Sequence, residues 1–539
     1  MTRHKLLSWK GLSLAGAAML LLTTSCTKNF DNLNANPNEA SEEQMATDNL
    51  KTGGFFAQML RNVVLFRDGT NLSSDYQVAQ GLTSDLYSGY IAPTGTWYGG
   101  LHNGSYYFIQ GWIERSFTSG FASIMPAWYA VKQAADQQGL PEVTALATVV
   151  KVQGMHRVAD AYGPIPYVNF GSGNLQNNYN SLQDVYRKFF EELDDAIDVL
   201  TQYAQGYPNG LLLADYDFMY GGNVTNWIKF ANTLRLRLAM RIANADAGLA
   251  RTEAEKSAAH PFGLIDSRET RAELKRTQLD YFHPLYEIAY TFNAGEVRMG
   301  ASMDAYMNGY NDPRLAAYFT RADDGGFHGV RQGIVTTNWT PYTAGTISNL
   351  RIDMGTTPIV WITGAESYFL RAEGALRGWN MGGTAQDFYN QGIAVSFVEN
   401  GLSAAAASTY ADNDINVPVA FVDNSGQSGN NYPAPSDITI KWEDGDSFNR
   451  SLERIITQKW IAMYPDGPEG WAEFRRTGYP KLLPVVTNNS NGTINTALQV
   501  RRLPFPQSEY NNNRAGVMTG VGLLGGPDAG GTPLWWDKR

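Results

Sequence analysis

Apolar residues recur at helical spacing in several segments that are separated by long irregular stretches. The segments are 141–162, 182–203, 225–242, 360–379, 385–398 and 448–464. In 182–203, apolar side chains three or four positions apart form one stripe, the pattern of a helix with one buried face. Pro164 and Pro166 end the first segment. Ser181 and Thr384 each precede an acidic residue by three positions, which is typical of helix N-caps. The chain is therefore predicted to be mostly α-helical.

The helices are expected to pack in pairs. Only residues 380–384 separate 360–379 from 385–398, and two helices joined by so short a turn lie antiparallel, as in helical-repeat folds. Arg235, Arg237 and Arg241 are expected at the margins of the helix over 225–242, where they would pair with acids or cover neighbouring helices.

Two regions rich in aromatic residues, 50–140 and 279–350, lack a continuous helical pattern. Within the first, residues 91–100 (IAPTGTWYGG) contain too many Gly and Pro residues for a helix, which predicts a loop. A Pro-, Asn- and Ser-rich insert follows at 412–436, and the tail beyond Arg475 is expected to be mostly irregular. We expect one domain over 47–539, with loop-rich insertions on a helical scaffold.

The N-terminus has the features of a secretory signal. Three basic residues, Arg3, Lys5 and Lys10, flank or precede the apolar run 11–22. This run is shorter than the ~20 residues that cross a bilayer, so residues 1–25 are predicted to be a signal peptide.

Small residues lead directly to Cys26, the sole cysteine of the chain. This arrangement resembles a bacterial lipoprotein processing site, at which the thiol is acylated, although Thr23 stands where Leu is usual. Cys26 is predicted to be the lipid anchor, and the polar residues 26–46 a tether. The alternative is an ordinary signal peptide followed by a chance cysteine.

Composition limits the partners. The chain has 43% hydrophobic and 17% charged residues, as globular proteins do, and a formal net charge of −10. Removal of residues 1–25 takes away three bases and no acid, and gives −13. This acidic balance argues against a nucleic-acid partner.

Enzyme and cofactor motifs are scarce. The six histidines show no metal-ligand spacing, and no Gly-x-Ser-x-Gly sequence occurs. Residues 520–525 (GVGLLG) match a dinucleotide fingerprint but follow no predicted strand. Asp412, Asp414, Asn416 and Asp423 have the spacing of calcium-loop ligands, yet Val417 replaces the required glycine. We expect no metal, no cofactor and no enzymatic activity; a glycosidase carboxylate pair stays open, since spacing alone does not identify one.

Two groups of residues are candidates for sugar binding, which uses exposed rings together with amides or acids. The first is Trp97, Tyr98, Asn103 and Asp85, and the second is Asn338, Trp339 and Tyr342. The alternative for each aromatic residue is buried packing or contact with a protein partner.

Seven segments together resemble the SusD/RagB family of outer-membrane nutrient-binding lipoproteins, in particular its starch-binding-associating subgroup. They are 30–38 (FDNLNANPN), 162–167 (YGPIPY), 311–315 (NDPRL), 366–373 (ESYFLRAE), 456–464 (ITQKWIAMY), 469–480 (EGWAEFRRTGYP) and 501–506 (RRLPFP). They occur in family order over nearly the whole chain.

The resemblance implies a tetratricopeptide-like scaffold of helix pairs, with a loop-rich region that carries the ligand site. It also implies a TonB-dependent transporter of the SusC type, over which such proteins sit as a lid. The matching residues Glu469, Trp471, Arg475 and Arg476 are expected to form a buried packing and ion-pair cluster rather than a site.

The predicted function is capture of an oligosaccharide at the cell surface by an outer-membrane lipoprotein and its delivery to the transporter. The alternatives are a peptide ligand, as in the RagB branch, and a lipid-anchored scaffold without a small ligand. A hydrolase is a further alternative, which product release from a polysaccharide by the pure protein would support.

Replacement of Cys26 tests the anchor. Cys26→Ala removes the acylated thiol, and each buried lipid CH₂ contributes about 0.8 kcal/mol to membrane attachment. The variant should fractionate as a soluble periplasmic or secreted protein. Retention of the variant in the membrane fraction would contradict the lipid anchor.

Overall fold

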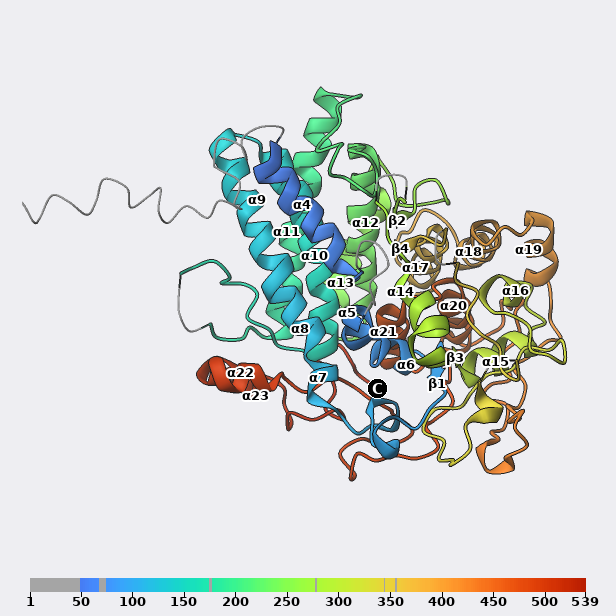
Figure 1. Cartoon of the computed structure of the whole chain (residues 1–539). Helices are drawn as coiled ribbons and strands as arrows, with labels where there is room; N and C mark the ends of the chain where they lie inside the picture. The colour runs from blue at the N-terminus through green and yellow to red at the C-terminus, as the bar shows by residue number, and fades with distance from the viewer. Residues whose placement is uncertain (1–48, 67–73, 174–176, 277–278, 344, 354–355) are drawn as a thin grey trace, which may run out of the picture. The chain divides into compact units, whose positions relative to one another are not determined.

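The computed structural model describes residues 49–66, 74–173, 177–276, 279–343, 345–353 and 356–539 (Figure 1). The described residues from Thr52 to Arg539 belong to one compact unit. The predicted signal peptide, the anchor Cys26, the tether 26–46 and the predicted domain start at 47 lie outside the described residues. No helix of the described ranges is long and apolar enough to cross a membrane.

Helices dominate the described residues. Those of the packed series and of the ion-pair network described below are α9 (Met125–Gln138), α10 (Pro141–Tyr162), α11 (Leu182–Gly206), α12 (Val224–Arg241), α13 (Ala247–Ala259), α17 (Gly364–Leu376), α18 (Ala385–Glu399), α20 (Phe448–Ala462) and α21 (Gly467–Thr477). The others are α4 (Leu50–Val63), α5 (Ser74–Tyr76), α6 (Ser84–Tyr87), α7 (Gln110–Ile113), α8 (Arg115–Ser119), α14 (Pro284–Tyr286), α15 (Ala301–Gly309), α16 (Leu315–Tyr318), α19 (Ala404–Ala411), α22 (Gln507–Asn512) and α23 (Arg514–Leu523).

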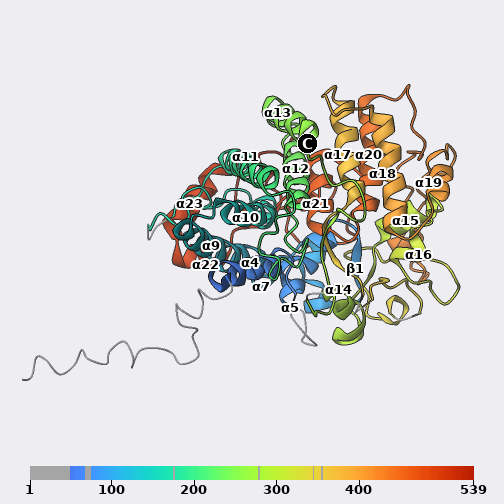
Figure 2. The ribbon, with the colours of Figure 1, turned by 90° about the horizontal axis from the view of Figure 1, so that it is seen from above.

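The helices pack in a consecutive series. α10 lies against α9 and α11, α11 against α12, and α12 against α13 and α17; α17 in turn packs against α18 and α20 (Figures 1 and 2). The predicted caps are present, since the hydroxyls of Ser181 and Thr384 accept hydrogen bonds from the backbone N–H groups of Asp184 and Asp387. The prediction of a mostly α, tetratricopeptide-like fold is confirmed.

The pair α17 and α18 is antiparallel, as predicted. Glu399, the last residue of α18, accepts a 2.8 Å hydrogen bond from the backbone N–H of Gly364 at the start of α17. The predicted helix over 360–379 is wrong at its start, because residues 359–362 are β-branched or aromatic and form a strand instead. The helix begins after Thr363, whose hydroxyl accepts a hydrogen bond from the backbone N–H of Glu366.

The strands form two small antiparallel ribbons. β1 (Ile91–Pro93) pairs with β3 (Val297–Met299), and β2 (Ala272–Leu274) pairs with β4 (Ile359–Ile362). In the tail, α22 and α23 interrupt an otherwise irregular chain. Gly520 and Gly522 lie within α23, so the glycine-rich sequence 520–525 is not a strand-to-helix turn.

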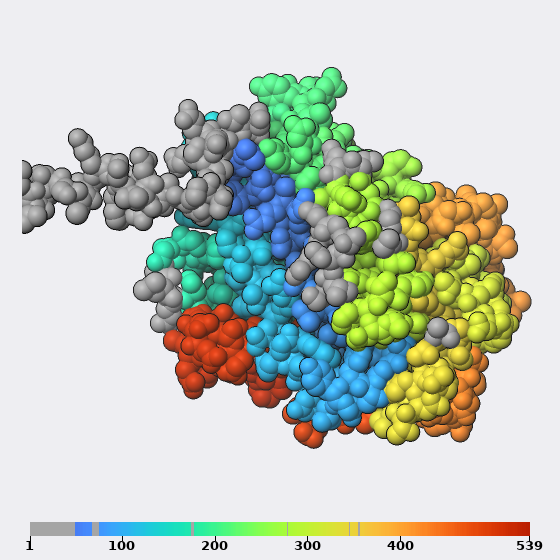
Figure 3. All heavy atoms as spheres, in the orientation of Figure 1, coloured from blue at the N-terminus to red at the C-terminus, as the bar shows by residue number. Residues whose placement is uncertain are grey.

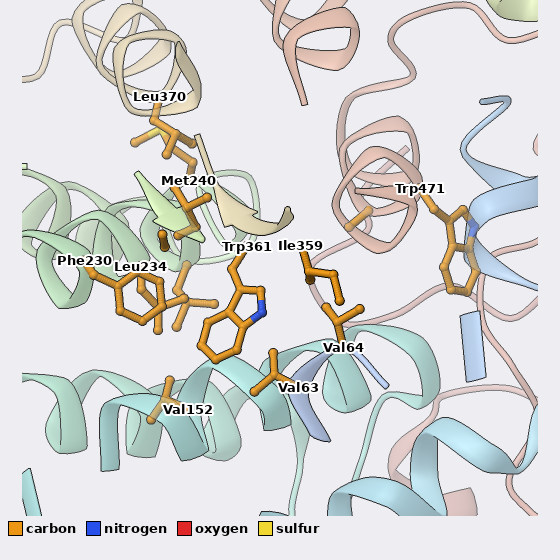
Figure 4. Packing of buried hydrophobic residues seen from close by; sticks show 14 of the residues in the cluster. Val63, Val64, Val152, Phe230, Leu234, Met240, Ile359, Trp361, Leu370 and Trp471 are labelled. Carbon is orange, nitrogen blue, oxygen red and sulfur yellow. The ribbon is translucent and has the colours of Figure 1, made fainter. Parts of the chain in front are cut away.

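Buried apolar side chains join the helices to the ribbons. Phe230 and Leu234 of α12, Leu370 of α17 and Trp361 of β4 belong to one cluster (Figure 4). Val152 of α10 belongs to it as well, so one continuous core links the early and late helices.

A buried ion-pair network runs through this core. Its members are Asp160 of α10, Arg237 and Arg241 of α12, Glu366 and Glu373 of α17, Lys459 of α20, and Glu469, Glu473 and Arg476 of α21. Arg476 makes two 2.6 Å hydrogen bonds to Glu373 and one of 2.7 Å to Glu473. Arg237 makes a similar pair of bonds to Glu366, of 2.7 and 2.6 Å.

The network confirms one prediction and corrects another. Glu469, Trp471, Arg475 and Arg476 are all buried, as expected of a packing and ion-pair cluster. The arginines of α12 do pair with acids, but they do not lie at the helix margins: Arg235, Arg237 and Arg241 are only 4%, 1% and 0% exposed. They are buried because helices pack around α12 on several sides.

Removal of one partner should cost much stability. Arg476→Met keeps the apolar stem of the side chain but leaves Glu373 and Glu473 without their counter-charge, and an unpaired buried charge costs about 3–5 kcal/mol. Unfolding in urea should show a loss of this size. The control is Lys132→Met, which breaks the exposed pair with Asp136 and should change the free energy of unfolding by less than about 1 kcal/mol. Equal losses in both variants would contradict a structural role for the network.

Candidate functional site: an aromatic platform

Hydrogen bonds to α20 hold the chain just before β1 and so position the loop that follows this strand. Tyr90 donates a 2.6 Å hydrogen bond to the carbonyl of Trp460, and the indole of Trp460 donates one of 2.8 Å to the carbonyl of Ser88. On the other side, the backbone N–H of Thr94 donates to the carbonyl of Glu296, just before β3. The scaffold therefore sets where the loop begins.

Three aromatic rings meet on this loop and on α7. Trp97 and Tyr98 lie in the kinked turn Trp97–Gly100, in which Tyr98 has a left-handed backbone with φ 47°. The ring of Trp112 on α7 lies 5.9 Å from that of Trp97 and 5.3 Å from that of Tyr98, each edge to face. Tyr98 is 68% exposed, while both tryptophans are half-buried. One face of the Tyr98 ring is therefore open to solvent, while the ring packs against the half-buried Trp112.

The second predicted loop reaches the same place. The indole N–H of Trp339 donates a hydrogen bond to the hydroxyl of Thr96, directly before Trp97. In Figure 3 the blue atoms of the first segment meet the yellow atoms of the second at the lower edge of the visible face. The two groups that the sequence offered as alternatives thus adjoin, and we call Trp97, Tyr98, Trp112 and Trp339 the aromatic platform.

Two predicted ligand residues are not at the surface. Asp85 is 2% exposed and accepts hydrogen bonds from the hydroxyl of Tyr76 (2.8 Å) and the amide of Gln80 (3.1 Å). Burial raises the pKa of Asp85 to about 7. Asn103 is 0% exposed, and its side-chain oxygen accepts from the backbone N–H of Ile109. Asp85 thus bonds residues of α5 and of the turn after it, and Asn103 bonds the chain before α7, while its side-chain N–H₂ has no partner among the described residues. Both side chains are buried, which corrects their predicted place at an exposed site.

Tyr342 also has an internal role. It is 1% exposed and donates a 2.7 Å hydrogen bond to Asp423, which also accepts from the amide of Asn430 at 2.6 Å. Asp423, the last residue of the supposed calcium loop, is therefore engaged here, while Asp414 faces Lys441 at 3.6 Å. Over the described ranges, no three His, Cys, Asp or Glu side chains are grouped as metal ligands.

An uncharged histidine and an exposed amide adjoin the platform. His102 lies behind Trp97, with ring centres 5.3 Å apart, and burial lowers its pKa to about 4, so it is uncharged at pH 7. Asn338, beside Trp339, is exposed, and its side-chain oxygen accepts from the backbone N–H of Thr340. Rings of this kind stack on the apolar faces of sugars, and amide and hydroxyl groups bond sugar hydroxyls.

The predicted site omitted Trp112. In the sequence it is one of many aromatic residues between 50 and 140, and no polar cluster next to it distinguishes it. Only its contact with Trp97 and Tyr98 in space identifies it.

Comparison with known proteins places this geometry in context. A sequence model described as SusD-like, Susd and RagB outer membrane lipoprotein, matches residues 32–537. No curated protein matches the chain.

Solved structures match over most of their length. A chitin-binding SusD homolog from Flavobacterium johnsoniae is 38% identical, with a TM-score of 0.85 over 90% of this chain and 99% of that one. A SusD homolog from Bacteroides uniformis is 36% identical, with a TM-score of 0.83 over 91% of this chain and 99% of that one. A SusD-like protein from Bacteroides thetaiotaomicron is also 36% identical, with a TM-score of 0.83, over 90% of this chain and 99% of that one.

Proposed function

The chain belongs to the SusD-like family of outer-membrane lipoproteins, and from this premise we propose that it binds a glycan at the aromatic platform without cleaving it. The observation that carries the proposal is the platform itself, in which a 68% exposed tyrosine stands among half-buried tryptophans. The chitin-binding homolog from Flavobacterium johnsoniae supports a glycan as the ligand class.

A neutral glycan suits the platform better than a peptide does. The rings adjoin the hydroxyl of Thr96 and the exposed amide of Asn338, and His102 is uncharged at neutral pH. These groups match the hydroxyls and apolar faces of a sugar ring, whereas a peptide would also present charged termini and side chains.

The wider role follows from family membership. The protein would be held at the cell surface through Cys26 and would deliver its glycan to a SusC-like TonB-dependent transporter. A lid movement over the transporter belongs to the same proposal. A glycan and peptide array separates this function from the alternatives. Binding of peptides but no glycan would indicate a peptide ligand, and binding of neither would indicate a scaffold without a small ligand.

The most exposed ring of the platform should contribute to affinity and little to stability. Tyr98→Ala removes a stacking surface, and we expect the dissociation constant for an N-acetylglucosamine oligosaccharide, or for another glycan found by array, to rise about tenfold, or ~1.4 kcal/mol. Isothermal titration measures the affinity, and the Tm should stay nearly unchanged.

A matched control exists on the helical side of the protein. Tyr207 is 65% exposed, and its ring lies 5.1 Å from that of Tyr203, much as the ring of Tyr98 lies beside Trp112. Tyr207→Ala should leave glycan affinity unchanged. Loss of affinity and Tm together in Tyr98→Ala would assign Tyr98 to packing and remove it from the site.

A further inference from the structure

A second feature of the structure is a cavity of about 300 Å³. None of the four platform residues is among the described residues that line this cavity. Its walls include Ile359 and Trp361 of β4, Val64 after α4, and Tyr464 after α20. In Figure 4 the indole nitrogen of Trp361 lies on the side of the ring that faces Ile359 and Val64. A volume of this size is at the lower end of small-ligand pockets, and is far more than the few waters a tight core holds.

Two hydrogen-bond donors in the walls are unused. Trp361 is 1% exposed and Tyr464 8%, and neither the indole N–H nor the phenol O–H has a hydrogen-bond partner among the described residues. A buried donor without an acceptor destabilises the folded protein. The apolar wall therefore holds donors for which the described chain supplies no acceptor.

Guanidinium groups line the cavity as well. Arg268 and Arg351 are exposed residues of the lining, and neither forms an ion pair with a carboxylate within the described ranges. Arg351 donates to the carbonyl of Ala316. Arg271 also lines the cavity but is paired with Glu273. Within the part of the chain that the structure describes, Arg268 and Arg351 thus form no direct ion pair, and Arg268 has only the exposed Glu269 as a nearby anion.

The acids of the lining face cations or backbone N–H groups of the chain. Glu366 is held by two hydrogen bonds from Arg237. Glu399 accepts from the backbone N–H groups at the start of α17. Asp466 lies 3.5 Å from Arg157 and 3.7 Å from Arg237. Both carboxylate oxygens of Asp466 lack a hydrogen bond among the described residues. The groups left for a ligand are therefore the two arginines, the two donors and this carboxylate, beside an apolar wall.

We propose that this cavity binds a small organic carboxylate, with its anionic group at Arg268 and Arg351 and its apolar body against Trp361 and Tyr464. Guanidinium groups recognise carboxylates through paired N–H donors, and the apolar wall selects a carbon body. The site is independent of glycan binding at the platform.

Phenylacetate is a suitable probe, and phenylacetamide is its neutral match. Isothermal titration of the full chain should show phenylacetate binding at least tenfold more tightly than phenylacetamide or inorganic phosphate. The double variant Arg268→Gln, Arg351→Gln should lose at least tenfold in phenylacetate affinity. Arg321→Gln should lose nothing, because Arg321 is likewise exposed and donates to a backbone carbonyl but does not line the cavity.

Tyr464→Phe separates binding from folding. The hydroxyl makes no hydrogen bond within the described chain, so its removal should leave the Tm unchanged or raise it while phenylacetate affinity falls. Tyr98→Ala should leave phenylacetate affinity unchanged. Equal affinity for phenylacetate and phenylacetamide, tighter binding of phosphate, or full affinity in the arginine double variant would overturn the proposal.

Discussion

The buried ion-pair network of α10, α12, α17, α20 and α21 is the constraint on which the rest of the structure depends. Burial of charges is costly, and the cost is offset only when each charge is paired with good geometry. Arg476 meets Glu373 and Glu473, and Arg237 meets Glu366, at hydrogen-bonding distance. These pairs join α12, α17 and α21, and the pairs of Asp160 with Arg241 and of Lys459 with Glu469 add α10 and α20. The network therefore fixes the relative placement of five helices.

The platform inherits its geometry from that arrangement. α20 carries Lys459 in the network and, at the next residue, Trp460, which bonds the chain around Ser88 and Tyr90. That chain leads into β1 and then into the loop with Trp97 and Tyr98. The rings of this irregular loop thus have a defined position, because β1 and the buried helix α20 fix the residues from which the loop starts. The outer end of the loop is held by Trp339 through Thr96.

Local patterns in the sequence predicted the helices well, because a helix with one buried face repeats every three or four residues. The strand at 359–362 was missed, since its apolar run continues directly into the pattern of α17. The burial of Asp85 and Asn103, and the union of the two aromatic loops, depend on contacts between distant residues such as Thr96 and Trp339. No local pattern encodes such contacts, so the sequence indicated the right loops and left their relation open.

The two loops are expected to act as one glycan-binding surface. Thr96→Val keeps the size of the side chain and removes only the acceptor of the Trp339 indole, so titration of this variant with the platform's glycan tests the claim directly. The affinity of Thr96→Val should fall about fivefold, or ~1 kcal/mol, because one hydrogen bond that holds the loops together contributes about this much. The Tm should stay unchanged. Wild-type affinity in Thr96→Val, together with wild-type affinity in Trp339→Ala, would contradict the claim.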